Sequence, residues 1–204
     1  MTAASPVTVV LATRNRHKVG EIAALLADLP IRLLGIDEVA AGLALIEDRD
    51  TFEGNAYAKA EQAAAATGLP SLADDSGLEV DALGGAPGVH SARYAGEPSD
   101  DARNNDRLLR ELAGVPAEKR GGRYRCVAAW VDPRSGSRRA FSGSCEGQIL
   151  ETPRGTGGFG YDPLFLIPAL GKTMAEIDQN VKNRLSHRAA AFRALAAALQ
   201  AEMR

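Results

Sequence analysis

The stretch from Val7 to Ile36 constrains the fold more than any other part of the chain, because its hydrophobic pattern changes type twice. Val7–Ala12 is a short apolar run of β type, and a polar segment, Thr13–Lys18, follows it. Apolar residues then recur at helical spacing until Pro30, at positions Val19, Ile22, Leu25, Leu26 and Leu29. Ile31–Ile36 is a second short β-type run. Strand, polar turn, helix and strand are typical of the start of an α/β protein, with ligand chemistry at the first turn.

The remaining pattern continues the alternation of helices and strands. The expected elements are an acidic irregular loop over Asp37–Asp50, a helix over Phe52–Thr67, a strand over Ser71–Ala73 that runs into a turn at Asp74–Gly77, a turn at Gly84–Gly88, a helix over Asp101–Leu112, an antiparallel hairpin of Tyr124–Val131 with Ser137–Ile149, a short helix over Thr173–Asp178, and a final helix that begins at Ser186 and buries Phe192, Leu195, Leu199 and Met203. No internal repeat or compositional shift marks a linker. The pattern therefore predicts one domain over residues 1–204.

Size and charge exclude several classes of function. A chain of 204 residues, 45% of them hydrophobic, can bury one sizeable core. A net charge of −2 argues against nucleic-acid binding. No apolar run approaches the roughly 18–20 residues needed to span a bilayer. Met1–Pro6 lacks the layout of a secretory signal, and two cysteines are too few for a disulfide scaffold, so the expected location is the cytoplasm.

The polar segment Thr13–Lys18 is predicted to bind phosphate. It lies where a strand meets a helix start, and there the unpaired backbone N–H groups and the helix dipole favour an anion. Thr13, Asn15 and Lys18 add hydroxyl, amide and ammonium donors. The segment is not a P-loop, because it lacks the glycines of GxxxxGK[ST]. The alternative is a solvated helix cap with basic residues on the surface.

Acidic residues in two segments predict a magnesium site. Asp74 and Asp75 follow a strand, and Glu47 and Asp48 lie in the acidic loop upstream. Mg²⁺ typically binds through one or two carboxylates, water and substrate phosphates, and one of the paired aspartates could instead orient an attacking water. Adjacent strand residues point to opposite faces, so both can serve one site only if the backbone turns. Asp-Asp-Ser-Gly is also typical of an ordinary turn.

The run Gly155–Pro163 places four glycines in six residues around one aromatic ring. Glycine is favoured where backbone approaches a ligand closely or adopts a positive φ. Phe159 could therefore stack on a flat ligand, and Asp162 could accept a hydrogen bond from the edge of that ligand. A tight turn between a strand and a helix is the alternative.

Lys182 and the triplet Ser186, His187 and Arg188 form the last candidate group. Ser186 is a good N-cap, which would place His187 and Arg188 at the first helical positions, facing outward. A guanidinium can donate to a ring carbonyl but cannot accept from an amine, so it could distinguish a 6-oxo purine from adenine. A surface helix cap is the alternative.

These segments occur in a fixed order along the chain, and in that order the chain resembles the inosine/xanthosine triphosphate pyrophosphatase family. The matching segments are Thr13–Lys18, the acidic loop, Asp74–Gly77, Gly84–Gly88 with Ser91–Tyr94, Gly155–Asp162 and Ser186–Arg188. The resemblance implies an elongated mixed β-sheet with flanking helices and two lobes around a central cleft. It also implies a homodimer that uses Mg²⁺ to hydrolyse dITP, ITP and XTP to the monophosphate and pyrophosphate, which removes damaged nucleotides from the pool.

The resemblance also implies roles for single residues. Asp75 would accept the proton of the attacking water and bind the metal, and Glu47 would be the second metal ligand, with Asp48 as a rival. The residues that would contact substrate are Thr13, Arg14, Asn15, Arg16, His17, Lys18, Lys59, Ser76 and Arg93 near the phosphates, and Phe159, Gly160, Tyr161, Asp162, Lys182, His187 and Arg188 around the base.

Two other functions remain open at this point. One is a Maf-like pyrophosphatase acting on dTTP or UTP, against which a stacking Phe159 and a carbonyl-reading Arg188 argue. The other is a nucleotide-binding sensor that does not cleave its ligand, and such a sensor has little use for an acid at the phosphates.

Overall fold

The start of the chain folds as a strand, a helix and a parallel strand, which confirms the α/β class. The computed structural model describes residues 6–202. Strand β1 (Val7–Leu11) pairs in parallel with β2 (Ile31–Gly35), with Val9 opposite Leu33. Helix α1 (Arg16–Leu25) connects them, and Asn15 caps its first turn. The polar segment Thr13–Lys18 therefore lies at the carboxyl end of β1, where ligands bind in α/β proteins.

Within residues 6–202, seven strands form one mixed sheet in the order β2-β1-β3-β4-β5-β6-β7. β1 pairs in parallel with β3, whereas β6 pairs antiparallel with both β5 and β7. The remaining elements are α2 (Ile36–Val39), α3 (Phe52–Thr67), β3 (Ser71–Val80), α4 (Asp101–Glu111), β4 (Gly121–Asp132), β5 (Ser137–Ile149), β6 (Phe165–Ile167), β7 (Lys172–Thr173), α5 (Gln179–Leu185) and α6 (His187–Glu202). The expected helix over Phe52–Thr67 and the long hairpin are confirmed, and so is the class of a mixed sheet with flanking helices.

The chain groups into two compact units, each with its own hydrophobic core. The first unit contains the residues up to Asp75, Cys126–Gly143 and the residues from Arg188 on; the second contains Ser76–Arg125 and Ser144–His187. Strands β3, β4 and β5 contribute residues to both units. The expected cleft between two lobes, and a single domain over residues 1–204, stay predictions.

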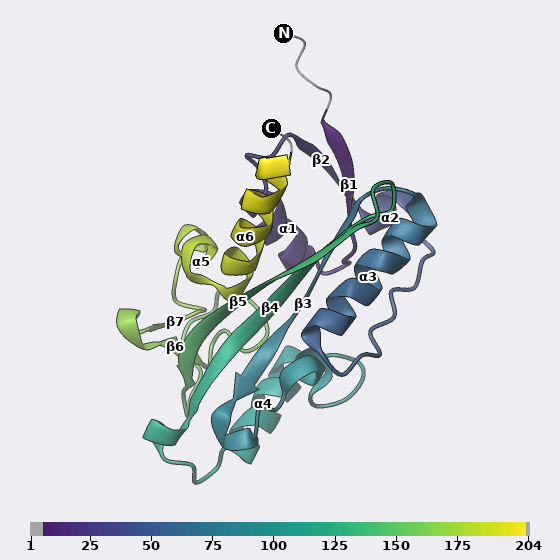
Figure 1. Cartoon of the computed structure of the whole chain (residues 1–204). Helices are drawn as coiled ribbons and strands as arrows, with labels where there is room; N and C mark the ends of the chain where they lie inside the picture. Colours follow the sequence, from purple (N-terminus) through teal and green to yellow (C-terminus); the bar gives the residue numbers. More distant parts are fainter. Residues whose placement is uncertain (1–5, 203–204) are drawn as a thin grey trace. The chain divides into compact units, whose positions relative to one another are not determined.

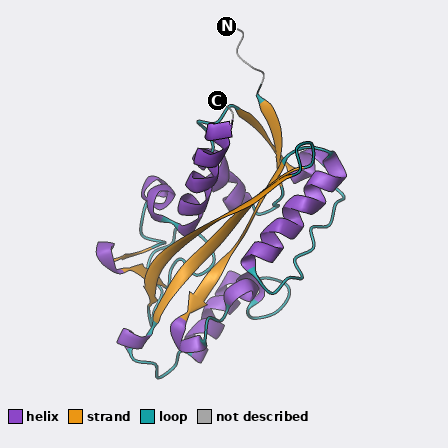
Figure 2. Ribbon diagram, in the orientation of Figure 1, coloured by secondary structure: helices purple, strands orange, loops and turns teal. Residues whose placement is uncertain are grey.

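In the first unit, helices cover both faces of the strands. Figure 1 shows α1 and α6 side by side on one face and α3 on the other, and Figure 2 shows the same helices in purple beside the orange strands. Ile22 of α1 and Phe192 of α6 are fully buried in one cluster with Leu72 of β3. Helix α3 presents small alanines to the sheet, so its backbone lies close to the strands, and it ends at Gly68, whose φ is 68°.

The second unit has an aromatic core. Tyr124 of β4 and Phe165 of β6 lie there with ring centroids 4.5 Å apart, and Leu108 of α4 is fully buried in the same cluster. Helix α4 begins at Asp101 because Asp100 accepts a hydrogen bond from Arg103 N.

No helix between residues 6 and 202 is both long enough and apolar enough to cross a membrane. Met203 and the first five residues of Met1–Pro6, which entered the predictions for the final helix and for cellular location, lie outside the described residues.

The expected turn at Asp74–Gly77 is wrong. All four residues belong to β3, which runs without a break from Ser71 to Val80. The turn propensity of Asp-Asp-Ser-Gly is overridden because β3 lies between β1 and β4, where backbone groups must pair with neighbouring strands. As in any strand, adjacent side chains point to opposite faces. Asp74 and Asp75 therefore face different environments.

The expected short helix over Thr173–Asp178 is also wrong. Gly171, with a φ of 62°, turns the chain back so that Lys172–Thr173 pairs with β6. The helix comes later, as α5, because the Asp178 side chain accepts a hydrogen bond from Val181 N and so caps a helix that starts at Gln179.

Candidate functional site

The turn after β1 is organised by its own polar side chains. Asn15 Oδ1 accepts hydrogen bonds from the N–H groups of His17 and Lys18, at 3.0 and 3.2 Å, and Thr13 Oγ1 accepts one from Asn15 N. Arg16 and His17 are exposed at the positive end of α1. The predicted phosphate segment thus lies at a capped helix N-terminus with basic side chains around it.

Arg14 ties this turn to the acidic loop. Its Nε donates to Asp37 Oδ1 at 2.8 Å, and its Nη2 donates to the carbonyl of Leu43 at 2.8 Å. The guanidinium therefore holds the start of that loop. A contact between Arg14 and substrate stays a prediction.

Asp74 lies at the centre of a buried ionic cluster in the first unit. Its Oδ2 is 3.0 Å from Lys18 Nζ and 3.3 Å from Arg188 Nε, and the Arg188 Nη1 donates to Glu21 Oε2 at 2.5 Å. Burial alone would raise the pKa of Asp74, but Lys18 and Arg188 outweigh it and hold the pKa well below its usual range. The cluster connects β3, α1 and α6 through charge.

The position of Arg188 corrects an expectation. His187 and Arg188 do begin α6, but neither faces outward: Arg188 is 1% exposed and His187 is 6% exposed. A guanidinium can be buried at this depth because two carboxylates compensate its charge. The carbonyl-reading role of Arg188 stays a prediction, and its observed partners are Asp74 and Glu21.

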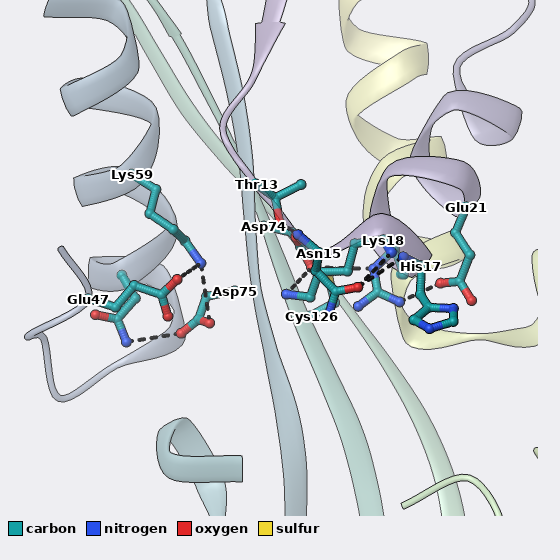
Figure 3. A network of polar contacts seen from close by, with 12 residues as sticks. Thr13, Asn15, His17, Lys18, Glu21, Glu47, Lys59, Asp74, Asp75 and Cys126 are labelled. Carbon is teal, nitrogen blue, oxygen red and sulfur yellow. Dashed lines mark hydrogen bonds and ion pairs between the residues drawn. The ribbon is translucent and has the colours of Figure 1, made fainter. Parts of the chain in front are cut away.

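Asp75 lies on the other face of β3, in a second cluster. Lys59 Nζ of α3 is 2.7 Å from Glu47 Oε1 and 3.6 Å from Asp75 Oδ1, and Asn55 Nδ2 donates to Asp75 Oδ2 at 3.0 Å. Figure 3 shows Glu47, Lys59 and Asp75 together on one side of the strand, with Asp74 and Lys18 on the other. Asp48 does not join them, because its side chain is exposed and pairs with Arg49. Between the two rival acids, the structure places Glu47 next to Asp75.

Burial gives Asp75 a different acidity from Asp74. Desolvation raises the pKa of Asp75, although Lys59, Lys18 and the hydrogen bond from Asn55 oppose it. The pKa of Lys59 is also raised: burial lowers it, but Asp75, Asp74 and Glu47 together have the greater effect. Two neighbouring aspartates thus have pKa values shifted in opposite directions, a pattern that accompanies acid–base function.

The Glu47–Asp75 pair fits a magnesium ion better than a structural metal. Among residues 6–202, no group of three or more His, Cys, Asp and Glu side chains is placed to hold a metal. Two carboxylates with hard oxygen donors are what Mg²⁺ uses when water and substrate phosphates complete its coordination. The Lys59 ammonium already lies within reach of both carboxylates, so this position stabilises positive charge.

In the second unit, Asp162 organises the glycine-rich loop. Its carboxylate accepts from Phe159 N at 3.1 Å, from Tyr124 Oη at 3.1 Å and from Lys182 Nζ at 2.9 Å. Gly158 has a φ of 74°, and a Cβ there would lie 2.0 Å from Asp162 Oδ2, so only glycine fits. The Lys182 ammonium lies 4.8 Å from the centroid of the Phe159 ring. The sequence thus predicted this grouping, but the Asp162 carboxylate is buried and engaged with the protein.

Two other residues predicted to surround the base are buried. The Tyr161 hydroxyl donates to the carbonyl of Ser91 at 2.8 Å, and its ring packs in the core of the second unit. The His187 ring stacks on Tyr124, with centroids 4.8 Å apart and planes inclined by 15°. Ser76 and Arg93 are both half-buried, and their contact with substrate stays a prediction, as does that of Gly160.

Sequence reasoning missed Asn55, Glu21 and Tyr124. Asn55 carried a usable signal, since it lies four residues before Lys59 and so on the same face of a helix. Glu21 and Tyr124 gave no such signal, because their partners Arg188 and Asp162 are 167 and 38 residues away along the chain.

Within the first unit, a capped helix N-terminus and a carboxylate pair around a buried lysine are typical of α/β proteins that bind phosphorylated ligands. Comparison with known proteins gives the particular family. The model of the Ham1 family matches residues 9–198, and the chain belongs to that family.

Relatives and solved structures agree with this assignment. The chain is 54% identical over 183 residues to a dITP/XTP pyrophosphatase of Geobacter sulfurreducens, covering 90% of this chain and 92% of the relative. A dITP/XTP pyrophosphatase of Desulforamulus reducens is 52% identical, with 90% and 91% covered. The solved structure of a HAM1 protein from Coxiella burnetii superposes with a TM-score of 0.88 at 40% identity, covering 96% of this chain and 99% of that one.

Proposed function

We propose that this protein hydrolyses non-canonical purine nucleoside triphosphates, namely dITP, ITP and XTP, to the monophosphate and pyrophosphate. The observation that carries the proposal is the Glu47–Lys59–Asp75 cluster, because it joins two carboxylates and a compensating cation in a family of pyrophosphatases. The relatives named dITP/XTP pyrophosphatase supply the class of base. The role is the removal of deaminated purine nucleotides from the pool.

The residues of the first unit act on the phosphates. The exposed side chains of Arg16 and His17 at the start of α1, together with the side chain of Lys18, donate to phosphate oxygens. Asp75 takes the proton of a water whose oxygen attacks the α-phosphorus, and the bond from that phosphorus to the bridging oxygen breaks as pyrophosphate leaves. Mg²⁺, when bound at Glu47 and Asp75, would neutralise phosphate charge and lower the pKa of a bound water. Lys59 lies within ion-pair distance of both carboxylates, 2.7 Å from Glu47 Oε1 and 3.6 Å from Asp75 Oδ1, and so holds them near each other.

The residues of the second unit act on the base. Phe159 offers a ring for stacking, and Asp162 fixes the backbone of that loop through Phe159 N. The side chain of Lys182 is held by the same carboxylate, so it is already ordered before a ligand arrives. A hydrogen-bond donor that faces the base can pair with the O6 carbonyl of inosine or xanthosine. The amine of adenine cannot accept this hydrogen bond, so buried groups are left unpaired at a cost of about 1–3 kcal/mol each.

A coupled assay tests the proposal. With inorganic pyrophosphatase present, phosphate release should be fastest with dITP, ITP and XTP, slower by on the order of 10²-fold or more with ATP, and absent in EDTA. A preference for dTTP or UTP would indicate the Maf-like alternative. Binding of dITP without phosphate release would indicate the sensor.

Removing the ring of Phe159 should weaken binding of the substrate base. Stacking on an aromatic side chain is worth about 1–3 kcal/mol, so Phe159→Ala should lower kcat/KM for dITP by about 5- to 150-fold. Steady-state kinetics on Phe159→Ala and on Phe159→Tyr, which keeps a ring, provide the comparison. An unchanged kcat/KM in the alanine variant would remove Phe159 from the base site.

Two further parts of the proposal concern assembly and location. The protein forms a homodimer and acts in the cytoplasm, where nucleotide pools are found. Size-exclusion chromatography with light scattering checks the first, and a mass near 43 kDa, twice the 21.4 kDa of the chain, is expected.

A further inference from the structure

One face of α3 holds the segment that carries Glu47. Asn55, Lys59 and Gln62 lie at positions i, i+4 and i+7 of the helix and therefore share a face. Gln62 accepts from Ile46 N at 2.9 Å and donates to Ile46 O at 3.1 Å. Lys59 binds Glu47 itself at 2.7 Å.

Asn55 completes this set. Its side-chain amide also contacts Asp75, which the contacts observed for the amide of Gln62 do not include. Its Oδ1 accepts from Arg49 N at 2.9 Å, and its Nδ2 donates to Asp75 Oδ2 at 3.0 Å. The side chain is 1% exposed. A backbone N–H requires an acceptor and a carboxylate requires a donor, so the two contacts fix which end of the amide points where. One buried group thus joins the loop around Glu47 to the strand that carries Asp75.

We propose that Asn55 is a positioning residue that presets the distance between the Glu47 and Asp75 carboxylates for the metal. The proposal rests on the assignment of Glu47 and Asp75 as the magnesium ligands under the proposed function. Glu47 lies in an irregular segment between α2 and α3, so its position depends on what holds that segment. Asn55 holds this segment at Arg49, two residues after Glu47. The same side-chain amide also donates to the Asp75 carboxylate and so orients it.

Loss of a hydrogen bond that orients a metal ligand typically lowers metal affinity by 10- to 100-fold. Asn55→Leu keeps the approximate shape of the side chain and removes both hydrogen bonds. Gln62→Leu is the matched control, because it removes an amide on the same helix that ties the same loop without touching Asp75. Asn55→Ser, which introduces less apolar bulk, is the second variant in case the leucine variant does not fold.

Two readouts separate positioning from general loss of structure. The first is affinity for Mn²⁺ alone, followed by the electron paramagnetic resonance of the free ion, which needs no turnover. It should fall by about 10-fold or more in Asn55→Leu and Asn55→Ser, and by less than about 3-fold in Gln62→Leu. The second is the Mg²⁺ concentration for half-maximal dITP hydrolysis. It should rise by a similar factor in the Asn55 variants, while kcat at saturating Mg²⁺ recovers to within about 3-fold of the parent.

The outcomes divide clearly. Mn²⁺ affinity unchanged in the Asn55 variants would overturn the proposal, and so would an equal loss in Gln62→Leu, which would assign the effect to loop tethering alone. Failure of the parent protein to hydrolyse dITP would instead count against the proposed function, because the Mn²⁺ measurement does not depend on that activity.

Discussion

Replacing Asp75 with asparagine should lower kcat for dITP by about 10²- to 10⁴-fold, the usual contribution of a positioned general base. The variant keeps the size of the side chain and its ability to accept from Asn55 Nδ2. It also removes a buried negative charge, while Lys59 retains Glu47 as a partner. Turnover should therefore fall without a comparable loss of stability, as measured by steady-state kinetics together with thermal unfolding.

Asp48→Asn is the matched control for that experiment. Asp48 is adjacent to Glu47 in sequence, but its side chain is exposed and pairs only with Arg49 among the contacts observed. Its kcat should stay close to that of the parent. Near-normal turnover in Asp75→Asn would show that Asp75 is not the proton acceptor.

Asp74→Asn should instead lower the free energy of unfolding more than Asp75→Asn does. The change leaves Arg188 buried with Glu21 as its remaining observed carboxylate and deprives Lys18 of its charge partner. Breaking a buried ion pair from one side costs about 3–5 kcal/mol, which corresponds to a fall in Tm of about 6–20 °C for a chain of this size. Calorimetry or chemical denaturation measures this directly.

Glu61→Gln provides the comparison at the surface. Glu61 pairs with Arg138 at 2.7 Å, but both side chains are about half exposed, so the pair should contribute less than about 1 kcal/mol. A loss below that same value in Asp74→Asn would mean that the buried cluster does not stabilise the fold.

The stability difference between the parent and Asp74→Asn should depend on pH. The pKa of Asp74 is lower in the folded protein than in the unfolded chain, so its contribution is present above the ordinary aspartate pKa of about 3.9 and is lost as pH falls through the folded value. Denaturation curves at pH 7 and at pH 3 should show the difference between the two proteins shrinking in acid. A difference that grows in acid would contradict the assigned ionisation.

The sequence predicted those elements whose signals are local. The helix over Phe52–Thr67 has both ends as expected, because Thr51 caps it and Gly68 ends it. The Asp74–Gly77 turn and the Thr173–Asp178 helix were wrong because pairing with other strands outweighed local propensity. Periodicity reports the face a residue presents, but it does not report which strand lies beside it.

The candidate site was predictable to the same extent. We could propose the residues around Thr13–Lys18 and the Phe159 loop because glycines and polar runs at strand ends are visible in one sequence, and their contact with substrate stays a prediction. Burial of Arg188 was not predictable, because the carboxylate that permits it, Asp74, is 114 residues away. The preference for Glu47 over Asp48 also required coordinates, since Glu47 pairs with the buried Lys59 whereas Asp48 is exposed and pairs with Arg49.

Because β3 runs without a break through Asp74 and Asp75, its pairing with the neighbouring strands decides which face of the sheet each aspartate occupies. Because side chains alternate along a strand, a slip of one position against β1 would exchange the aspartate beneath α1 for the one facing α3. A slip in one direction would place Ser76 where Asp75 now lies, and a slip in the other direction would place Ala73 where Asp74 now lies, so either register loses one of the two carboxylates. The register of β3 therefore bears both on the buried ionic cluster and on the proposed proton acceptor.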